Sequence, residues 1–181
     1  MFGEVGYDAA TFQEIAERSD LTRPAVNHYF PSKRALYREV VEQTNTLVIA
    51  AGVKKAEQES VFSPRLRAFI AEAVAVQGRD PAVAAFLVTS VLESQRHPEL
   101  RRDGNDALEA TRTFLVWALD EAVGAGEVRA DVDVGIAADT LVAMLWGLGF
   151  YAGFVGSQDQ LVAVAEEFLR MLHGETVRGT A

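Results

Sequence analysis

The stretch Leu21–Lys33, LTRPAVNHYFPSK, concentrates side chains that can bind nucleic acid within thirteen residues. Arginine and lysine pair with phosphate, and an arginine can also bind guanine as an asparagine can bind adenine. Between positions 18 and 38 the chain has five basic residues and one acidic residue, although its net charge is −9. A local basic face on an acidic chain is typical of a protein that reads a DNA sequence rather than coating nucleic acid.

The rest of the chain offers no set of residues for enzyme or metal chemistry. There is no cysteine, and the histidines at 28, 97 and 173 do not have metal-ligand spacing. A glycine-rich phosphate loop, a GxSxG motif and an HExxH motif are all missing. We therefore expect no catalytic residue, no metal and no cofactor. The lack of cysteine and of a signal-peptide pattern favours a cytoplasmic location.

The elements that must position the basic stretch are two short helices in an all-α protein. Alanine, leucine, glutamate and arginine dominate, and β-branched runs of period two are missing. Thr11 with Glu14 fits a capping box that opens a helix to about Arg18. Thr22 can cap a second helix to about Tyr29. Two helices joined by a short turn predict a helix-turn-helix, whose second helix enters the major groove of DNA.

The helices after this motif are expected to begin at recognisable caps. Ser32 follows Pro31 and can cap a long helix over Lys33–Ala56. Ser63-Pro64 and Asp80-Pro81 repeat one pattern, a capping residue before a proline at the first helical position. A long helical stretch is expected from His97-Pro98 to about Gly124, an apolar helix after Asp133, and a last helix to about His173.

The segment GYDAATFQEIAERSDLTRPAVNHYFPSKRAL resembles the DNA-binding half of the TetR family of bacterial transcriptional regulators. The residues that fall in the family pattern are Gly6, Thr11, Ile15, Ala16, Thr22, Tyr29, Phe30, Ser32 and Lys33. The remainder of the chain resembles the family in its helices, its length and its apolar C-terminal part. The resemblance implies a DNA-binding part over 1–46 and a helical ligand-binding and dimerisation part over 47–181.

Physical chemistry and the resemblance together give a set of expected DNA contacts. Arg23 and Asn27 would read guanine and adenine, and Gln13 on the preceding helix would reach a base. Thr11, Tyr29 and Lys33 would contact the phosphate backbone. The complete expected set is Thr11, Gln13, Thr22, Arg23, Pro24, Asn27, His28, Tyr29 and Lys33. The core of the motif is expected to contain Ile15, Ala16, Leu21, Val26 and Phe30.

Two departures from the family pattern stand out. The family commonly has tyrosine where this chain has Asn27, which favours a reading role for Asn27. The family also has a first helix before the Phe-x-x-x-Gly segment, whereas Met1-Phe2 here begins at the last turn of that helix. A misassigned start codon or a truncated form is our hypothesis. Ile15 and Phe30 are then expected to lose part of their cover.

The C-terminal bundle is expected to hold a small-molecule effector and a dimer interface. Aromatic side chains are candidates for an apolar pocket, namely Phe69, Phe86, Trp117, Trp146, Phe150 and Tyr151. Gln95, His97, Asn105 and Thr113 are candidate polar contacts. The uncharged stretch 140–158 and the apolar stripe of the last helix predict a homodimer interface that contains Leu141, Leu145, Leu148, Phe154, Leu161, Phe168 and Leu172.

The sequence thus predicts a ligand-responsive DNA-binding regulator, most consistent with a repressor that a small, largely apolar molecule releases from its operator. Its expected partners are double-stranded operator DNA, the effector and a second copy of the chain. An alternative is a helical dimer that binds a small molecule but not DNA. A membrane protein is a third interpretation, because the stretch 140–158 has the length of a span. It lacks flanking basic residues, and we expect no membrane.

Overall fold

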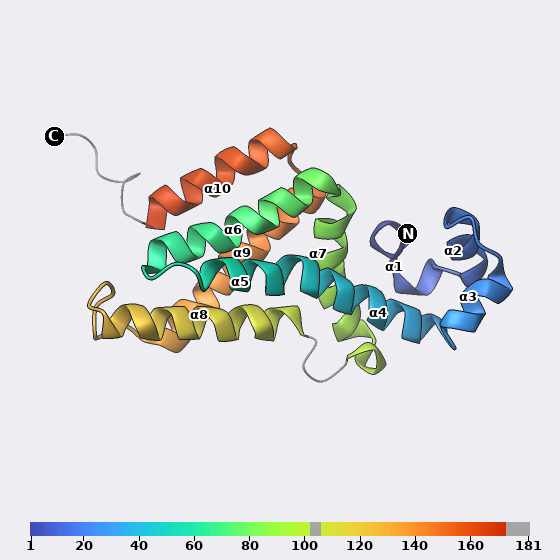
Figure 1. Ribbon diagram of the computed structural model, residues 1–181, viewed down its shortest axis with the longest axis horizontal. Coiled ribbons are helices and arrows are strands. Elements are labelled where there is room, and N and C mark those ends of the chain that lie inside the picture. The colour runs from blue at the N-terminus through green and yellow to red at the C-terminus, as the bar shows by residue number, and fades with distance from the viewer. Residues whose placement is uncertain (102–105, 173–181) are drawn as a thin grey trace.

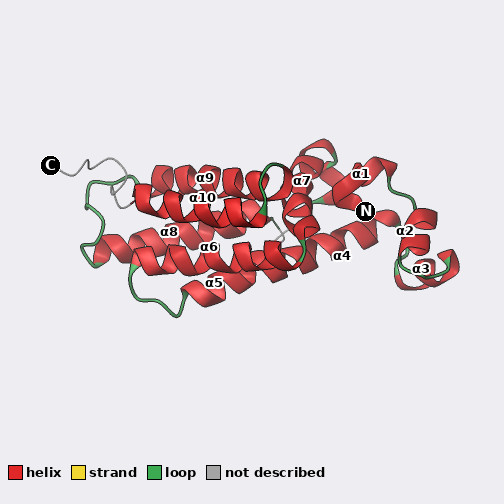
Figure 2. Cartoon of the chain, turned by 90° about the horizontal axis from the view of Figure 1, so that it is seen from above, coloured by secondary structure: helices red, strands yellow, loops and turns green. Residues whose placement is uncertain are grey.

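The computed structural model describes residues 1–101 and 106–172, and it shows an elongated, all-helical molecule in this part of the chain (Figure 1). The N-terminal helices form one end, a bundle of longer helices forms the other, and one long helical segment joins them (Figure 2). The described helices are α1 (Phe2–Ala9), α2 (Phe12–Arg18), α3 (Arg23–Tyr29), α4 (Lys33–Asn45), the π-helical turn η1 (Thr46–Ala50), α5 (Ala51–Ala56), α6 (Phe62–Arg79), α7 (Pro81–Arg96), the 3₁₀ turn η2 (Pro98–Leu100), α8 (Ala107–Gly124), α9 (Val134–Phe154) and α10 (Gln158–Leu172).

Side-chain caps begin most of these helices, as the sequence predicts. The Thr11 hydroxyl accepts a hydrogen bond from the Glu14 N–H at 3.2 Å and donates one to the Glu14 carboxylate at 2.7 Å. Each such bond to an N–H satisfies a backbone donor that the first helical turn leaves unpaired. Hydroxyl or carboxylate caps also confirm the predictions for Thr22, Ser32, Asp80 and Asp133.

Two predicted helix starts are wrong. Helix α6 begins at Phe62, one residue before Ser63, and its first N–H donates to the Glu127 carboxylate at 2.8 Å. A cap from a residue so distant in the chain leaves no local signal. The stretch after His97 is not one long helix, because η2 ends at Leu100 and α8 starts anew with Asp106 as its cap.

The segment that joins the two ends runs from Lys33 to Ala56, as predicted, but it contains a π turn. Helices α4 and α5 continue through η1 with right-handed helical backbone angles at both junctions. The hydroxyls of Thr44 and Thr46 donate to the carbonyls four residues earlier, at 2.8 and 2.9 Å, directly before and at the start of this turn. Threonine bonds of this kind bend helices, and single π turns are frequent at functional sites.

The buried apolar side chains form two clusters. The larger lies in the bundle and includes residues from η1 and from α5 to α10. The smaller joins α1–α4 to the bundle, because Phe86 of α7 packs there with Phe2 and Tyr37. The DNA-binding part therefore shares its core with α7.

Candidate nucleic-acid interface and effector cavity

Helices α2 and α3 form a helix-turn-helix at one end of the molecule (Figure 1). Ala16 of α2 and Val26 of α3 are buried where the helices cross. Asp20 in the turn has φ of 52°, a left-handed conformation that asparagine and aspartate tolerate better than most residues. Ile15 and Phe30 are half-buried. The prediction that Leu21 is core is wrong, because it follows this turn and is 50% exposed.

The outer face of α3 carries the predicted DNA-reading side chains. Arg23, Pro24, Asn27, His28 and Tyr29 are all exposed, and the exposed fraction of Tyr29 reaches 71%. Arg23 and Asn27 are four residues apart and therefore lie on the same side of the helix. This face has the position and chemistry of a recognition helix.

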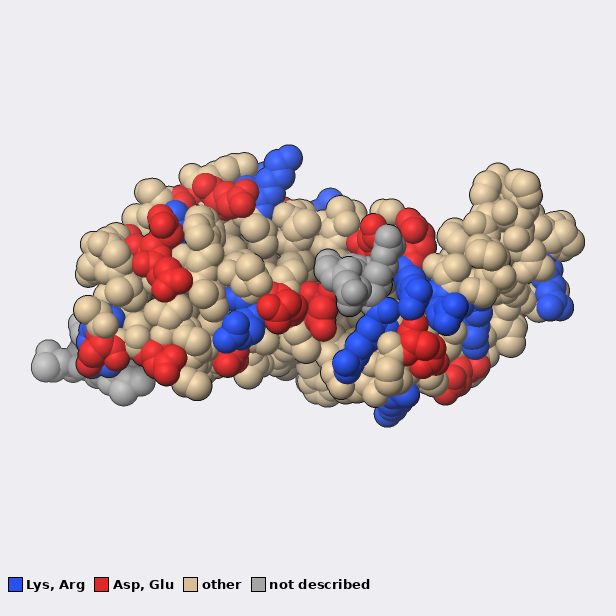
Figure 3. Space-filling view, turned by 90° about the horizontal axis from the view of Figure 1, so that it is seen from below, with Lys and Arg blue, Asp and Glu red and all other residues tan. Residues whose placement is uncertain are grey.

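The other side chains of this part that are predicted to contact DNA form hydrogen bonds within their own helices. Thr11 and Thr22 cap their helices, and Gln13 donates to the Glu17 carboxylate at 2.6 Å. Figure 3 shows one face of the whole molecule, with acidic and some basic side chains spread over the bundle, basic side chains mixed with acidic ones at the junction, and a mostly uncharged surface toward the DNA-binding end.

Lys33 points inward, toward the end of α1. Its ammonium donates to the carbonyls of Tyr7 and Asp8 at 2.8 and 3.1 Å and lies 4.5 Å from the centre of the Tyr7 ring. A cation here satisfies the carbonyls at a helix C-terminus. A phosphate contact by Lys33 stays a prediction, and the structure gives this residue a role in holding α1.

The bundle contains a partly open apolar cavity of about 90 Å³. It lies between η1, α6, α7, α8, α9 and α10, and its lining side chains within the described ranges carry no charge. The buried hydroxyl of Thr111 in its wall already donates to the Ala107 carbonyl at 2.7 Å. Val48 and Ile49, which belong to the π turn, form part of the same wall.

Comparison with known protein families places both parts of the chain. Residues 1–40 match the bacterial regulatory proteins of the tetR family, and residues 63–174 match the C-terminal part of BetI-type transcriptional repressors. The chain belongs to the TetR family of transcriptional regulators. The resemblance and the fold class deduced from the sequence are confirmed. Proteins of this family are transcriptional regulators and not enzymes.

Individual relatives agree with this assignment. The uncharacterized HTH-type transcriptional regulator YezE of Bacillus subtilis (strain 168) is 24% identical over 164 residues, which are 89% of this chain and 84% of YezE. The TetR-family regulator PfmR of Thermus thermophilus has a TM-score of 0.71 and 25% identity, covering 93% of this chain and 92% of PfmR. AibR, solved with isovaleryl coenzyme A and operator DNA, has the same fold with a TM-score of 0.69, 17% identity and coverage of 94% and 90%.

The predicted pocket residues of this TetR-family regulator lie at several different places. Phe69 and Trp146 line the cavity, and Trp117 lines an open groove between the α4–α5 segment and α8. Phe86 belongs to the core shared with α1 and α4. Phe150 is exposed beside Phe154, and Tyr151 is half-buried under Gly156.

The predicted polar contacts lie away from the cavity. Gln95 accepts a hydrogen bond from Arg101, Thr113 lines the groove, and His97 lies at the junction of the two parts. Asn105 is outside the described residues. The cavity wall consists mainly of small aliphatic residues, whose types do not distinguish a cavity wall from ordinary core.

The predicted dimer residues divide into buried and exposed groups. Leu141 and Leu161 are buried within the chain, and Leu145, Leu148 and Leu161 line the cavity. Phe168 is partly buried against the main core. Phe154 and Leu172 are exposed on α9 and α10 and remain available to a second subunit.

Lys33→Met is expected to destabilise the fold. The variant leaves two carbonyls at the end of α1 without their cation, which should cost about 1–2 kcal/mol in the free energy of unfolding. Urea denaturation would measure this, with Arg34→Met as the control because Arg34 is an exposed neighbour on the same helix. Equal stability of the two variants would contradict the role of Lys33 in holding α1.

Proposed function

We propose that this regulator is a homodimeric repressor that leaves its operator when a small, uncharged, largely apolar molecule enters the bundle cavity. The observation that carries the proposal is the cavity wall. Val48 and Ile49 line it and belong to the same continuous helical segment that starts at Lys33, directly after the recognition helix. An effector there would touch the element that orients α3.

The chemistry of the cavity supports an uncharged effector. A buried charge without a partner costs several kcal/mol, and the described residues of the cavity wall offer no charged side chain to compensate it. AibR was solved with isovaleryl coenzyme A and operator DNA, and another protein of similar fold is a gamma-butyrolactone receptor. These relatives support a small-molecule effector and a DNA partner. The cavity of this chain favours an effector without charge.

The mechanism is a shift between two arrangements of the dimer. A ligand can move such an equilibrium only by its different affinity for the two states. Filling the cavity would displace the π turn, tilt α4 and change the spacing of the two α3 helices. Because those helices must reach major grooves about one turn of DNA apart or a multiple of it, the changed spacing would weaken operator binding.

Dimerisation is proposed through α9 and α10. Helix α9 is 21 residues long with a mean hydropathy of 1.5, which by length and composition would suffice for a membrane span, and only 11% of its most apolar window is buried within the chain. We assign its open face to a second subunit, because the neighbouring Phe150, Phe154 and Leu172 are exposed as well. We also propose a cytoplasmic location, because the dimer must reach DNA there.

Binding to DNA from the region around the protein's own gene would test the DNA-binding role by fluorescence anisotropy. We expect tight binding to one fragment with a steep dependence on salt, because phosphate contacts release counterions. Arg23→Ala and Asn27→Ala should each cost about 1–3 kcal/mol in binding free energy. Arg129→Ala is the control, since Arg129 is exposed in the loop between α8 and α9.

The DNA experiment also distinguishes the alternative function. Binding at the level of random DNA for every fragment would reject the repressor and leave a helical dimer that binds only a small molecule. Loss of affinity in the Arg129 variant equal to that in the Arg23 variant would reject α3 as the recognition helix.

Phe154→Lys is expected to convert the dimer to a monomer. Phe150 and Phe154 pack together with ring centres 5.4 Å apart on the open face of α9, and a charge at this site would lie unpaired in an apolar interface. Light scattering at micromolar concentration should give two chains for the natural protein and one for the variant. Leu92→Lys is the control, because Leu92 is similarly exposed but lies on α7. A natural protein with the mass of one chain would refute the proposed interface.

Ligand binding in the cavity can be followed by the fluorescence of Trp146. In a Trp117→Phe background, Trp146 is the one tryptophan left in the sequence. We expect 1-hexanol to shift its emission, and hexanoate and hexylamine to bind at least ~10-fold more weakly, since each must bury a charge.

Ala84→Leu should abolish the hexanol response by filling the cavity, at a cost of about 1–3 kcal/mol in stability. Ala82→Leu is the control, because Ala82 is exposed on the same helix. Equal binding of the charged and the neutral probes would contradict an uncharged effector.

A further inference from the structure

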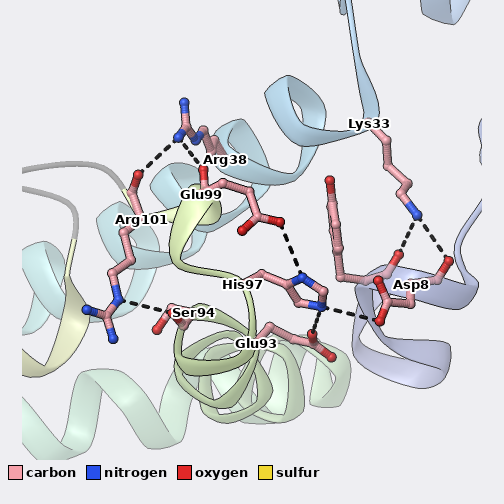
Figure 4. Close-up of polar contacts among 9 residues, drawn as sticks. Asp8, Lys33, Arg38, Glu93, Ser94, His97, Glu99 and Arg101 are labelled. Carbon is pink, nitrogen blue, oxygen red and sulfur yellow. Dashed lines mark hydrogen bonds and ion pairs between the residues drawn. The ribbon is translucent and has the colours of Figure 1, made fainter.

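Helix α7 has two functional ends. Val83, Ala84, Leu87 and Val88 of its first half line the cavity. His97, which follows its last residue, lies against α1 of the DNA-binding part (Figure 4). The same helix therefore contacts both the cavity and, through His97, the DNA-binding part.

Three carboxylates surround the His97 ring. The Nε2 atom lies 3.3 Å from an Asp8 oxygen and 3.6 Å from a Glu93 oxygen, and Nδ1 lies 3.3 Å from a Glu99 oxygen. Asp8 belongs to α1, Glu93 to α7 and Glu99 to η2. The imidazole thus connects the DNA-binding part to two elements of the bundle.

This arrangement suits a charged imidazolium and not a neutral imidazole. A neutral ring has one N–H, so its other nitrogen would present a lone pair to a carboxylate. The imidazolium has a donor at each nitrogen and satisfies Asp8 and Glu99 together. When it loses the proton, three carboxylates remain close together without the cation between them.

The other groups that face the ring come from α1 and α4. The Tyr7 ring centre lies 5.3 Å from that of His97. Burial raises the pKa of Tyr7, and the negative charge of Glu99 adds to this effect, so the phenol stays neutral. Lys33 and Arg38 use their charges on backbone carbonyls, Lys33 on those of Tyr7 and Asp8, and Arg38 on those of Glu99 and Arg101. Among the side-chain types at this junction, histidine is the one whose ordinary pKa lies between pH 5 and 8.

We propose that His97 is a proton-dependent latch between the DNA-binding part and helix α7. In its protonated form it holds Asp8 of α1 against Glu93 and Glu99, and in its neutral form it loses the attraction to Asp8 and loosens this edge of the contact between α1 and α7. The latch makes the orientation of the recognition helix sensitive to pH as well as to the effector. Its consequence for operator binding rests on the proposed function, but the latch itself does not.

A double-mutant cycle between Asp8 and His97 at two pH values tests the latch. Asp8→Asn, His97→Gln and the double variant would be unfolded with urea at about pH 5.5 and about pH 8, which bracket the ordinary titration of histidine and leave carboxylates ionised. The Asp8 side chain is 80% exposed, so its variants should fold. At the lower pH we expect Asp8→Asn to shift the unfolding equilibrium by about two- to five-fold in favour of unfolding. This shift corresponds to the stabilisation that an exposed ion pair usually provides.

At the higher pH the same substitution should be neutral or stabilising, because it removes one of three neighbouring carboxylates. Both effects should vanish in the His97→Gln background. Asp120→Asn and His28→Gln are the matched controls, since both residues are exposed and distant from the junction. An equal cost of Asp8→Asn at the two pH values, or a cost that persists without His97, would overturn the proposal.

Operator affinity measured with the same variants separates the latch from the proposed function. If the pH dependence of operator binding is lost equally in Asp8→Asn and His97→Gln, the latch acts on DNA binding. His28 lies on α3 among the predicted DNA contacts, so its variant is used only in the unfolding cycle, and the operator comparison uses the difference from the natural protein. A coupling between Asp8 and His97 without any operator binding would support the latch and reject the repressor. Operator binding without that coupling would support the repressor and reject the latch.

Discussion

The architecture depends on the packing of three aromatic rings, those of Phe86 on α7, Phe2 and Tyr37. The Phe86 ring centre lies 6.4 Å from that of Phe2 and 5.6 Å from that of Tyr37, and Phe2 meets Tyr37 edge-on at 5.0 Å. All three side chains are buried. Such pairs contribute beyond the area they bury. This cluster attaches a small helix-turn-helix, which has few large apolar residues of its own, to a bundle that has many.

The same packing makes α7 the central helix of the molecule. It contacts α1 and α4 of the DNA-binding part and α6, α8 and α9 of the bundle. Gly153 of α9 permits a very close contact, because a Cβ atom there would lie 2.7 Å from the Ala85 Cα. A closely packed interior of this kind transmits strain. The cavity at one part of α7 and His97 at its end therefore lie on one closely packed helix.

The sequence predicts the parts of this structure that local chemistry determines. The helix-turn-helix, its threonine caps and the long segment Lys33–Ala56 follow from residues close together in the chain. The features that the sequence does not predict depend on contacts between residues that are far apart in the chain. The Glu127 cap on α6 and the turn of Lys33 toward α1 have partners far along the chain. A cavity bounded by Val83 and Leu87 looks like core until the packing is known.

The open face of α9 shows how the charge and the apolar surface of this chain fit together. A net charge of −9 disfavours association between copies through charged surfaces. Helix α9 carries no charged residue after Asp139, so two copies can meet there without bringing like charges together. The five basic residues between positions 18 and 38 lie on α2, α3 and α4, in the part where DNA would bind. Separating the apolar face from the basic residues would let each bind the partner proposed for it, and the long segment from α4 to α5 joins the two parts.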